Sequence, residues 1–136
     1  MSLTTRSDKP EEKMVFTMDL EPRLKILKEN NVLSEENYER TLNIIRHFND
    51  EYDIKLIEEN ASAFITHLCI ALERASRSEP VQAIDPETYE EVTLHPAYEQ
   101  VCKISDSIRE MHPFIPESEI GYLNLHLTAM IENIQS

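Results

Sequence analysis

Apolar residues recur every three or four positions in five separate stretches of the chain, which is the spacing of amphipathic α-helices. The predicted helices cover about 19–30, 34–52, 58–77, 96–111 and 116–134. Asp19 and Ser34 are candidate caps for the first two helices. Pro96 and Pro116 stand where a first helical turn tolerates proline. This pattern predicts an all-α fold, a five-helix bundle.

The helical spacing breaks at about 80–95. Two short segments, Val81–Ile84 and Tyr89–Leu94, flank Asp85-Pro86-Glu87-Thr88, a sequence typical of a type I turn. We therefore expect a short β-hairpin or an irregular loop here. Residues 1–18 are polar and predict a flexible N-terminal arm, so that 19–136 would form a single helical domain.

Composition narrows the function. The chain has 26 acidic and 13 basic residues, a net charge of −13, which disfavours direct binding of nucleic acid. Its single glycine, Gly121, excludes glycine-rich phosphate loops. Because there is no long apolar run, no N-terminal signal core and only two cysteines, we expect a cytoplasmic protein that contacts no membrane.

The five histidines are candidates for metal ligands or catalytic groups. No His-Glu-x-x-His or Glu-x-x-His motif occurs, and neither Cys69 nor Cys102 stands in a cysteine-nucleophile signature. We therefore expect no metal, no cofactor and no enzymatic activity, with a metal site or a Cys–His nucleophile as minor alternatives. His47, His95 and His112 are expected to be structural or surface residues.

His67 and His126 lie at the edges of apolar helix faces. On the third predicted helix, His67 falls about 100° from the centre of the apolar stripe and Arg74 about 120°, on the same side. His126 and Glu119 share one edge of the fifth predicted helix in the same way. A boundary imidazole can be partly accessible and oriented by its neighbours, although each histidine could also be a hydrogen-bonded residue without function.

These positions also predict how the two helices pack. In an antiparallel pair, facing residues have a constant sum of residue numbers. His67 with His126 gives the same sum as Arg74 with Glu119. We therefore expect an antiparallel register that brings the two histidines into one site and pairs the two charges.

Two segments, Ile65–Arg74 and Glu119–Leu127, resemble the histidine motifs of the PRD family, the phosphotransferase-system regulation domains of bacterial antiterminators and activators of sugar operons. The first motif has a histidine and, seven residues later, an arginine, here His67 and Arg74. The second has a glutamate, often a glycine, then Tyr-Leu and a histidine, here Glu119, Gly121, Tyr122, Leu123 and His126. The interval between the histidines is similar to the family's, and the resemblance covers about 30–136. One departure is His95, which precedes Pro96 where the family commonly has asparagine.

The resemblance implies a five-helix bundle that commonly dimerises. It also implies that His67 and His126 accept phosphoryl groups from phosphorylated HPr or from IIB-type permease components, with Arg74 and Glu119 in support. Only about 18 residues precede the first predicted helix, so we expect the regulated effector of sugar-linked transcription to be a separate protein. The alternative is a helical interaction or dimerisation module of the same fold that is not phosphorylated.

A homodimer is also suggested by apolar helix positions beyond those that one small bundle needs. These are Ile44, Ile45, Ile70, Leu125 and Met111.

Overall fold

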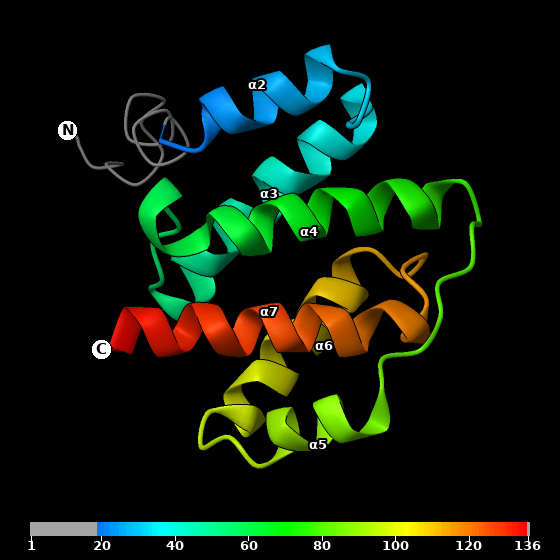
Figure 1. Cartoon of the computed structure of the whole chain (residues 1–136). Helices are drawn as coiled ribbons and strands as arrows, with labels where there is room; N and C mark the ends of the chain where they lie inside the picture. Colours follow the sequence, from blue (N-terminus) through cyan, green and yellow to red (C-terminus); the bar gives the residue numbers. More distant parts are fainter. Residues whose placement is uncertain (1–18, 136) are drawn as a thin grey trace, which may run out of the picture. The chain divides into compact units, whose positions relative to one another are not determined.

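The computed structural model describes residues 19–135, and within them it contains six α-helices and no strand (Figure 1). The helices are α2 (Glu21–Glu29), α3 (Glu35–Tyr52), α4 (Glu58–Ser76), α5 (Pro86–Thr93), α6 (Tyr98–Met111) and α7 (Glu117–Gln135). Five of them match the predicted helices, so the all-α prediction is confirmed. The predicted N-terminal arm, residues 1–18, lies outside the described residues.

The sixth helix, α5, occupies much of the segment 80–95. The predicted hairpin is wrong, and the alternative of an irregular loop holds for residues 80–85. The Asp85 side chain accepts a hydrogen bond from the Thr88 backbone N–H at 3.1 Å, and Pro86 occupies the first turn. Asp-Pro-x-Thr begins a type I turn and a helix in the same way. The turn continues as a helix that buries Val92.

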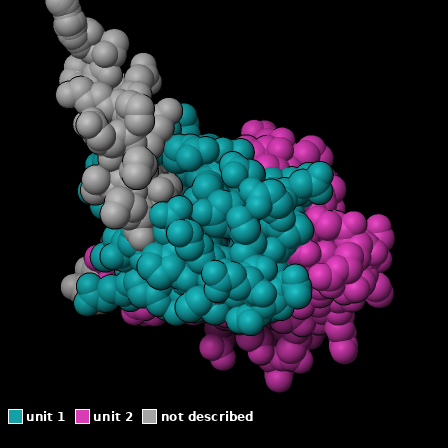
Figure 2. All heavy atoms as spheres, turned by 90° about the horizontal axis from the view of Figure 1, so that it is seen from above, with its two compact units in different colours: residues 1–62 teal, residues 63–136 magenta. Residues whose placement is uncertain are grey.

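The chain divides into two compact units, residues 1–62 and 63–136 (Figure 2). The division falls inside α4. The single domain that the sequence suggested over 19–136 stays a prediction. Within residues 19–135, no helix has both the length and the apolar character needed to cross a bilayer.

In the first unit, α2 packs against α3. Ser34 caps α3 as predicted, since its hydroxyl accepts from the Asn37 N–H at 3.2 Å. The interior is aliphatic and aromatic; its fully buried side chains include Leu20, Leu24, Ile44, Ile45, Phe48 and Leu56.

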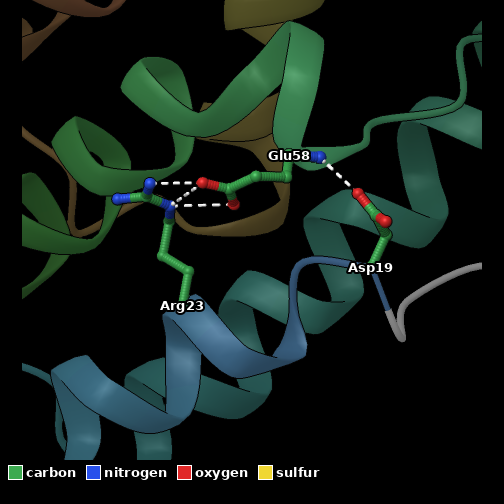
Figure 3. Close-up of polar contacts among 3 residues, drawn as sticks. All are labelled: Asp19, Arg23 and Glu58. Carbon is green, nitrogen blue, oxygen red and sulfur yellow. Dashed lines mark hydrogen bonds and ion pairs between the residues drawn. The ribbon is translucent and has the colours of Figure 1, made fainter.

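The sequence suggested that Asp19 caps α2, and this is wrong. The N-cap residue of α2 is Leu20, which makes no side-chain cap hydrogen bond. Instead, the Asp19 carboxylate accepts from the backbone N–H of Glu58, the first residue of α4 (Figure 3). The Glu58 side chain in turn forms an ion pair with Arg23 of α2. One contact from α2 and one from Asp19, just before it, therefore reach the beginning of α4. The Arg23 hydrogen bonds lower the pKa of the Glu58 carboxyl.

In the second unit, α7 packs against both α5 and α6. Residues 63–76 of α4 run beside α7 in the opposite direction (Figure 1). The shared core is formed by fully buried residues that include Phe64, Leu68, Leu72, Ile104, Ile108, Leu123 and Leu127.

Two of the apolar positions that suggested a homodimer are internal. Ile44 and Ile45 have no exposed surface, so they are core residues of the chain itself. Ile70 and Leu125 are half-buried, and only Met111 is clearly exposed, at 36%. The homodimer stays a prediction, and Ile44 and Ile45 no longer support it.

Candidate functional site

The rings of His67 on α4 and His126 on α7 stack on each other. Their centroids are 4.4 Å apart and their planes are inclined by 28°. Both side chains are half-buried, as expected at the edge of an apolar helix face. The predicted antiparallel register is confirmed, and it brings the two imidazoles into one site.

Two turns along the same edge, Arg74 and Glu119 form a bidentate ion pair. Arg74 Nε donates to Glu119 Oε2 and Nη2 donates to Oε1, both at 2.9 Å. The Glu119 side chain is 0% exposed and that of Arg74 is 27% exposed. A planar fork that binds both oxygens of a buried carboxylate fixes geometry as well as charge, so this pair sets the register of α4 against α7.

The site keeps its histidines neutral. Burial first, and then the neighbouring His126 and Arg74, lower the pKa of His67 to about 4, while Glu119 opposes the shift. Burial also lowers the pKa of His126. At neutral pH both rings therefore carry a lone pair on one nitrogen, which is the form that attacks an electrophile or binds a metal.

The Nε2 atom of His67 is buried and has no hydrogen-bond partner among the described residues. The Tyr122 ring lies near it, with its centroid 5.9 Å from that of His67. Tyr122 belongs to the second histidine motif, and the sequence alone indicates no role for it. The available signal was its spacing, because Tyr122 lies one turn before His126 and so faces α4 on the same side of α7.

The other histidines make separate contacts. His47 packs edge-on against Tyr52. His95 Nδ1 accepts from the Ala97 N–H at 3.0 Å, so it forms the turn before α6 that an asparagine side chain forms elsewhere. Its Nε2 lies 3.8 Å from the Glu132 carboxylate.

The alternative chemistries gain no support from the geometry. Among residues 19–135, no group of three or more His, Cys, Asp or Glu side chains comes together as a metal site would require. Cys69 is buried and Cys102 is half-buried. The residues that the site does bring together are the four that the sequence analysis selected: His67, His126, Arg74 and Glu119.

Comparison with known families gives one match. The family model described as PRD domain matches residues 42–130, well over half of the chain and a range that contains all four site residues. Comparisons with curated proteins and with solved structures find no match. The chain therefore belongs to the PRD domain family, whose members are regulatory domains linked to the phosphotransferase system.

Proposed function

We propose that this chain is a phosphoryl-accepting regulatory domain. His67 and His126 take a phosphoryl group from a phosphorylated protein of the phosphotransferase system, of the HPr or IIB type. The observation that supports this most is the pairing of two neutral imidazoles in one site beside a bidentate Arg74–Glu119 pair. The chain acts as acceptor, and the donor supplies the energy-rich phosphate.

The transfer balances without a cofactor. The lone pair of a neutral imidazole nitrogen attacks the donor's phosphorus, and a new N–P bond forms. The bond between phosphorus and the donor's phosphorylated side chain breaks, and its electron pair returns to the donor atom. The acceptor ring loses the proton from its other nitrogen, and the released donor side chain or the solvent takes it up. The depressed pKa of His67 helps, because the lone pair is not blocked by a proton at neutral pH.

The added phosphoryl group changes the electrostatics around the Arg74–Glu119 pair, which fixes the alignment of α4 and α7. A phosphoryl group carries about two negative charges, judged by other phosphorylated side chains. Near Arg74 it competes with Glu119 for the guanidinium, and Glu119 is fully buried. A buried carboxylate that loses its partner is costly, so we expect phosphorylation to favour a different packing of α7 against residues 63–76 of α4.

This change of packing is the regulatory signal in our proposal. It alters how the domain meets a separate effector of sugar-linked transcription, or a second copy of itself, in the cytoplasm. Sedimentation of the phosphorylated and unphosphorylated chain, at low and high micromolar concentration, distinguishes these two outputs. A monomer throughout would exclude dimerisation as the output.

One observation favours a second candidate function, a protein-interaction module that is never phosphorylated. The Nε2 atom of His67 is closed to solvent in this conformation. A domain that had kept the fold and lost phosphoryl transfer could bury this nitrogen permanently.

The test is incubation of the full chain with phosphoenolpyruvate and purified donor proteins of the HPr and IIB types. We expect acid-labile, base-stable phosphate that requires the donor. It should disappear in a His67→Ala/His126→Ala variant and persist in His47→Ala, a histidine substitution in the first unit. Failure of every donor to label the folded chain would favour the interaction module instead.

A further inference from the structure

Tyr122 joins the histidine site to the segment between α4 and α5. Its hydroxyl donates to the Gln82 carbonyl oxygen at 2.8 Å, while its ring lies 5.9 Å from the His67 ring. Gln82 belongs to residues 79–85, a stretch without regular secondary structure that we call the strap. The strap leads from the C-terminal end of α4 past the beginning of α7 to α5 (Figure 1).

A second contact holds the strap one residue earlier on α7. A Cβ atom built on Gly121 would lie 2.6 Å from Ile84 Cγ2 and 3.3 Å from Ile84 Cβ. Ile84 is β-branched and restricted at χ1, and rotation about χ1 leaves its Cβ atom in place, so the side chain relieves this contact only in part while its backbone is fixed. Only glycine at position 121 lets the strap lie this close to α7.

The His67 ring meets two rings of α7, those of Tyr122 and His126, which are one helical turn apart. Its Nε2 atom has no contact with solvent. Because Nε2 is buried, a phosphoryl donor reaches it only after groups around it have moved, and the rings of Tyr122 and His126 are among its neighbours. Tyr122 is the ring that a hydrogen bond ties to the strap.

We propose that Tyr122 is a positioning residue that closes Nε2 of His67, and that the strap holds it closed through the Tyr122–Gln82 hydrogen bond and the Gly121–Ile84 contact. This closure by Tyr122, which we call the gate, limits access to His67 more than access to His126. Where it concerns phosphoryl transfer, this inference rests on the proposed function; where it concerns access, it does not.

Access can be measured without any phosphoryl donor. Diethyl pyrocarbonate modifies neutral, accessible imidazole nitrogens, and peptide mass spectrometry gives a rate for each histidine of the full chain. With a pKa of about 4, His67 is neutral throughout the range from pH 6 to 7.5. A change in its rate in this range reports access rather than titration.

Two variants open the gate by different routes. Tyr122→Phe keeps the ring and removes the hydrogen bond, and Gly121→Ala displaces Ile84 and the strap. Tyr89→Phe is the matched control, because it removes a tyrosine hydroxyl of the same unit that bonds to Tyr98 and Asn124. We expect the His67 rate to rise about three- to tenfold in both gate variants, the change that loss of one hydrogen bond produces in an open population.

The His67 rate in Tyr89→Phe should stay at the wild-type value, as should the His47 rate in every variant. Backbone hydrogen exchange of residues 81–85 should speed up in Tyr122→Phe. An unchanged His67 rate in a folded Tyr122→Phe would overturn the gate, even if Gly121→Ala failed to fold. An equal rise in Tyr89→Phe would also overturn it, since general loosening would then be the cause.

A parallel reaction with the phosphoryl donor separates the gate from the proposed function. We expect Tyr122→Phe to raise the initial labelling rate of His67 relative to that of His126. If diethyl pyrocarbonate reacts faster in the variant while no donor labels any form of the chain, the gate stands and the proposed function fails. If donors label wild type and Tyr122→Phe alike and the His67 modification rate is also unchanged, the proposed function stands and the gate fails.

Discussion

Arg74 and Glu119 are bound through two hydrogen bonds of 2.9 Å, and the Glu119 side chain has no exposed surface at all. The two partners are therefore unequal. Arg74 is 27% exposed and could be solvated if its partner were removed. Glu119 could not, because its surroundings exclude water.

This asymmetry predicts the effect of Arg74→Ala on folding. The substitution leaves a buried carboxylate without its partner, so we expect the free energy of unfolding to fall by about 3 kcal/mol. Glu119→Gln should cost less, because the amide can still accept from Arg74 and carries no charge. Urea denaturation at pH 7 measures both values.

A double-mutant cycle and a matched arginine complete this test. Arg74→Ala/Glu119→Gln should recover part of the loss seen in Arg74→Ala, since the uncompensated charge is gone. Arg77→Ala removes an arginine that is 52% exposed and paired with Glu73 and Glu79. It should cost less than about 1 kcal/mol. Equal losses for Arg74→Ala and Arg77→Ala would contradict the importance of the buried pair.

The histidine pair predicts a dependence of stability on pH. Because the pKa of His67 is lowered to about 4, the unfolded chain binds more protons than the folded chain between about pH 4 and pH 6.5. Stability therefore rises with pH across this window and is lost as the pH falls through it. Allowing for solvent screening of a half-exposed ring, we expect a loss of about 1 kcal/mol between pH 7 and pH 5.

The measurement is the free energy of unfolding by urea at pH 5, 6 and 7. His67→Gln should flatten the dependence, and His67→Gln/His126→Gln should flatten it further, since burial also lowers the pKa of His126. The range stops at pH 5 to stay above the titration of Glu58, whose pKa is lowered by Arg23. If the double variant kept the wild-type dependence of the free energy of unfolding on pH, that dependence would come from groups other than His67 and His126.

Net charge predicts the response to nucleic acid. With 13 basic residues against 26 acidic ones, we expect no binding of RNA or DNA tighter than about 100 µM at physiological salt. Fluorescence anisotropy with labelled single- and double-stranded oligonucleotides measures this. A submicromolar affinity that weakens as salt is added would contradict it and would require a basic surface that the composition does not suggest.

The register of the site could be read from the sequence because it is periodic. His67, Arg74, Glu119 and His126 lie at regular helical intervals on two long amphipathic helices, and one antiparallel alignment satisfies both pairs. Helical periodicity carries that information without any tertiary contact.

The strap could not be predicted in this way. The Tyr122–Gln82 bond joins residues 40 positions apart, and one of them lies in a segment with no periodicity. The contribution of Asp19 was missed for a similar reason. Its position predicts a cap for the helix that follows it in sequence, whereas the Asp19 carboxylate accepts from the backbone N–H of Glu58, 39 positions away.

The error at residues 80–95 came from local chemistry that two structures share. Asp85 before Pro86 starts both a type I turn and a helix, and only the residues that follow decide between them. Here Val92 is buried at 2% exposure and Tyr89 bonds to Tyr98 and Asn124. These tertiary contacts of α5 favour the helix over the hairpin.

Asp85 should therefore act as a helix cap whose loss is felt locally. Asp85→Ala removes the acceptor for the Thr88 N–H, and we expect a loss of about 1 kcal/mol in the free energy of unfolding. Hydrogen exchange should speed up in α5 and leave the amides of α3 unchanged. Asp85→Asn, which keeps a side-chain oxygen at the cap, should restore most of the stability. If residues 86–93 formed a hairpin instead, no series of helical hydrogen bonds would begin at Asp85. Asp85→Ala would then not speed up hydrogen exchange selectively at the amides of Tyr89–Thr93.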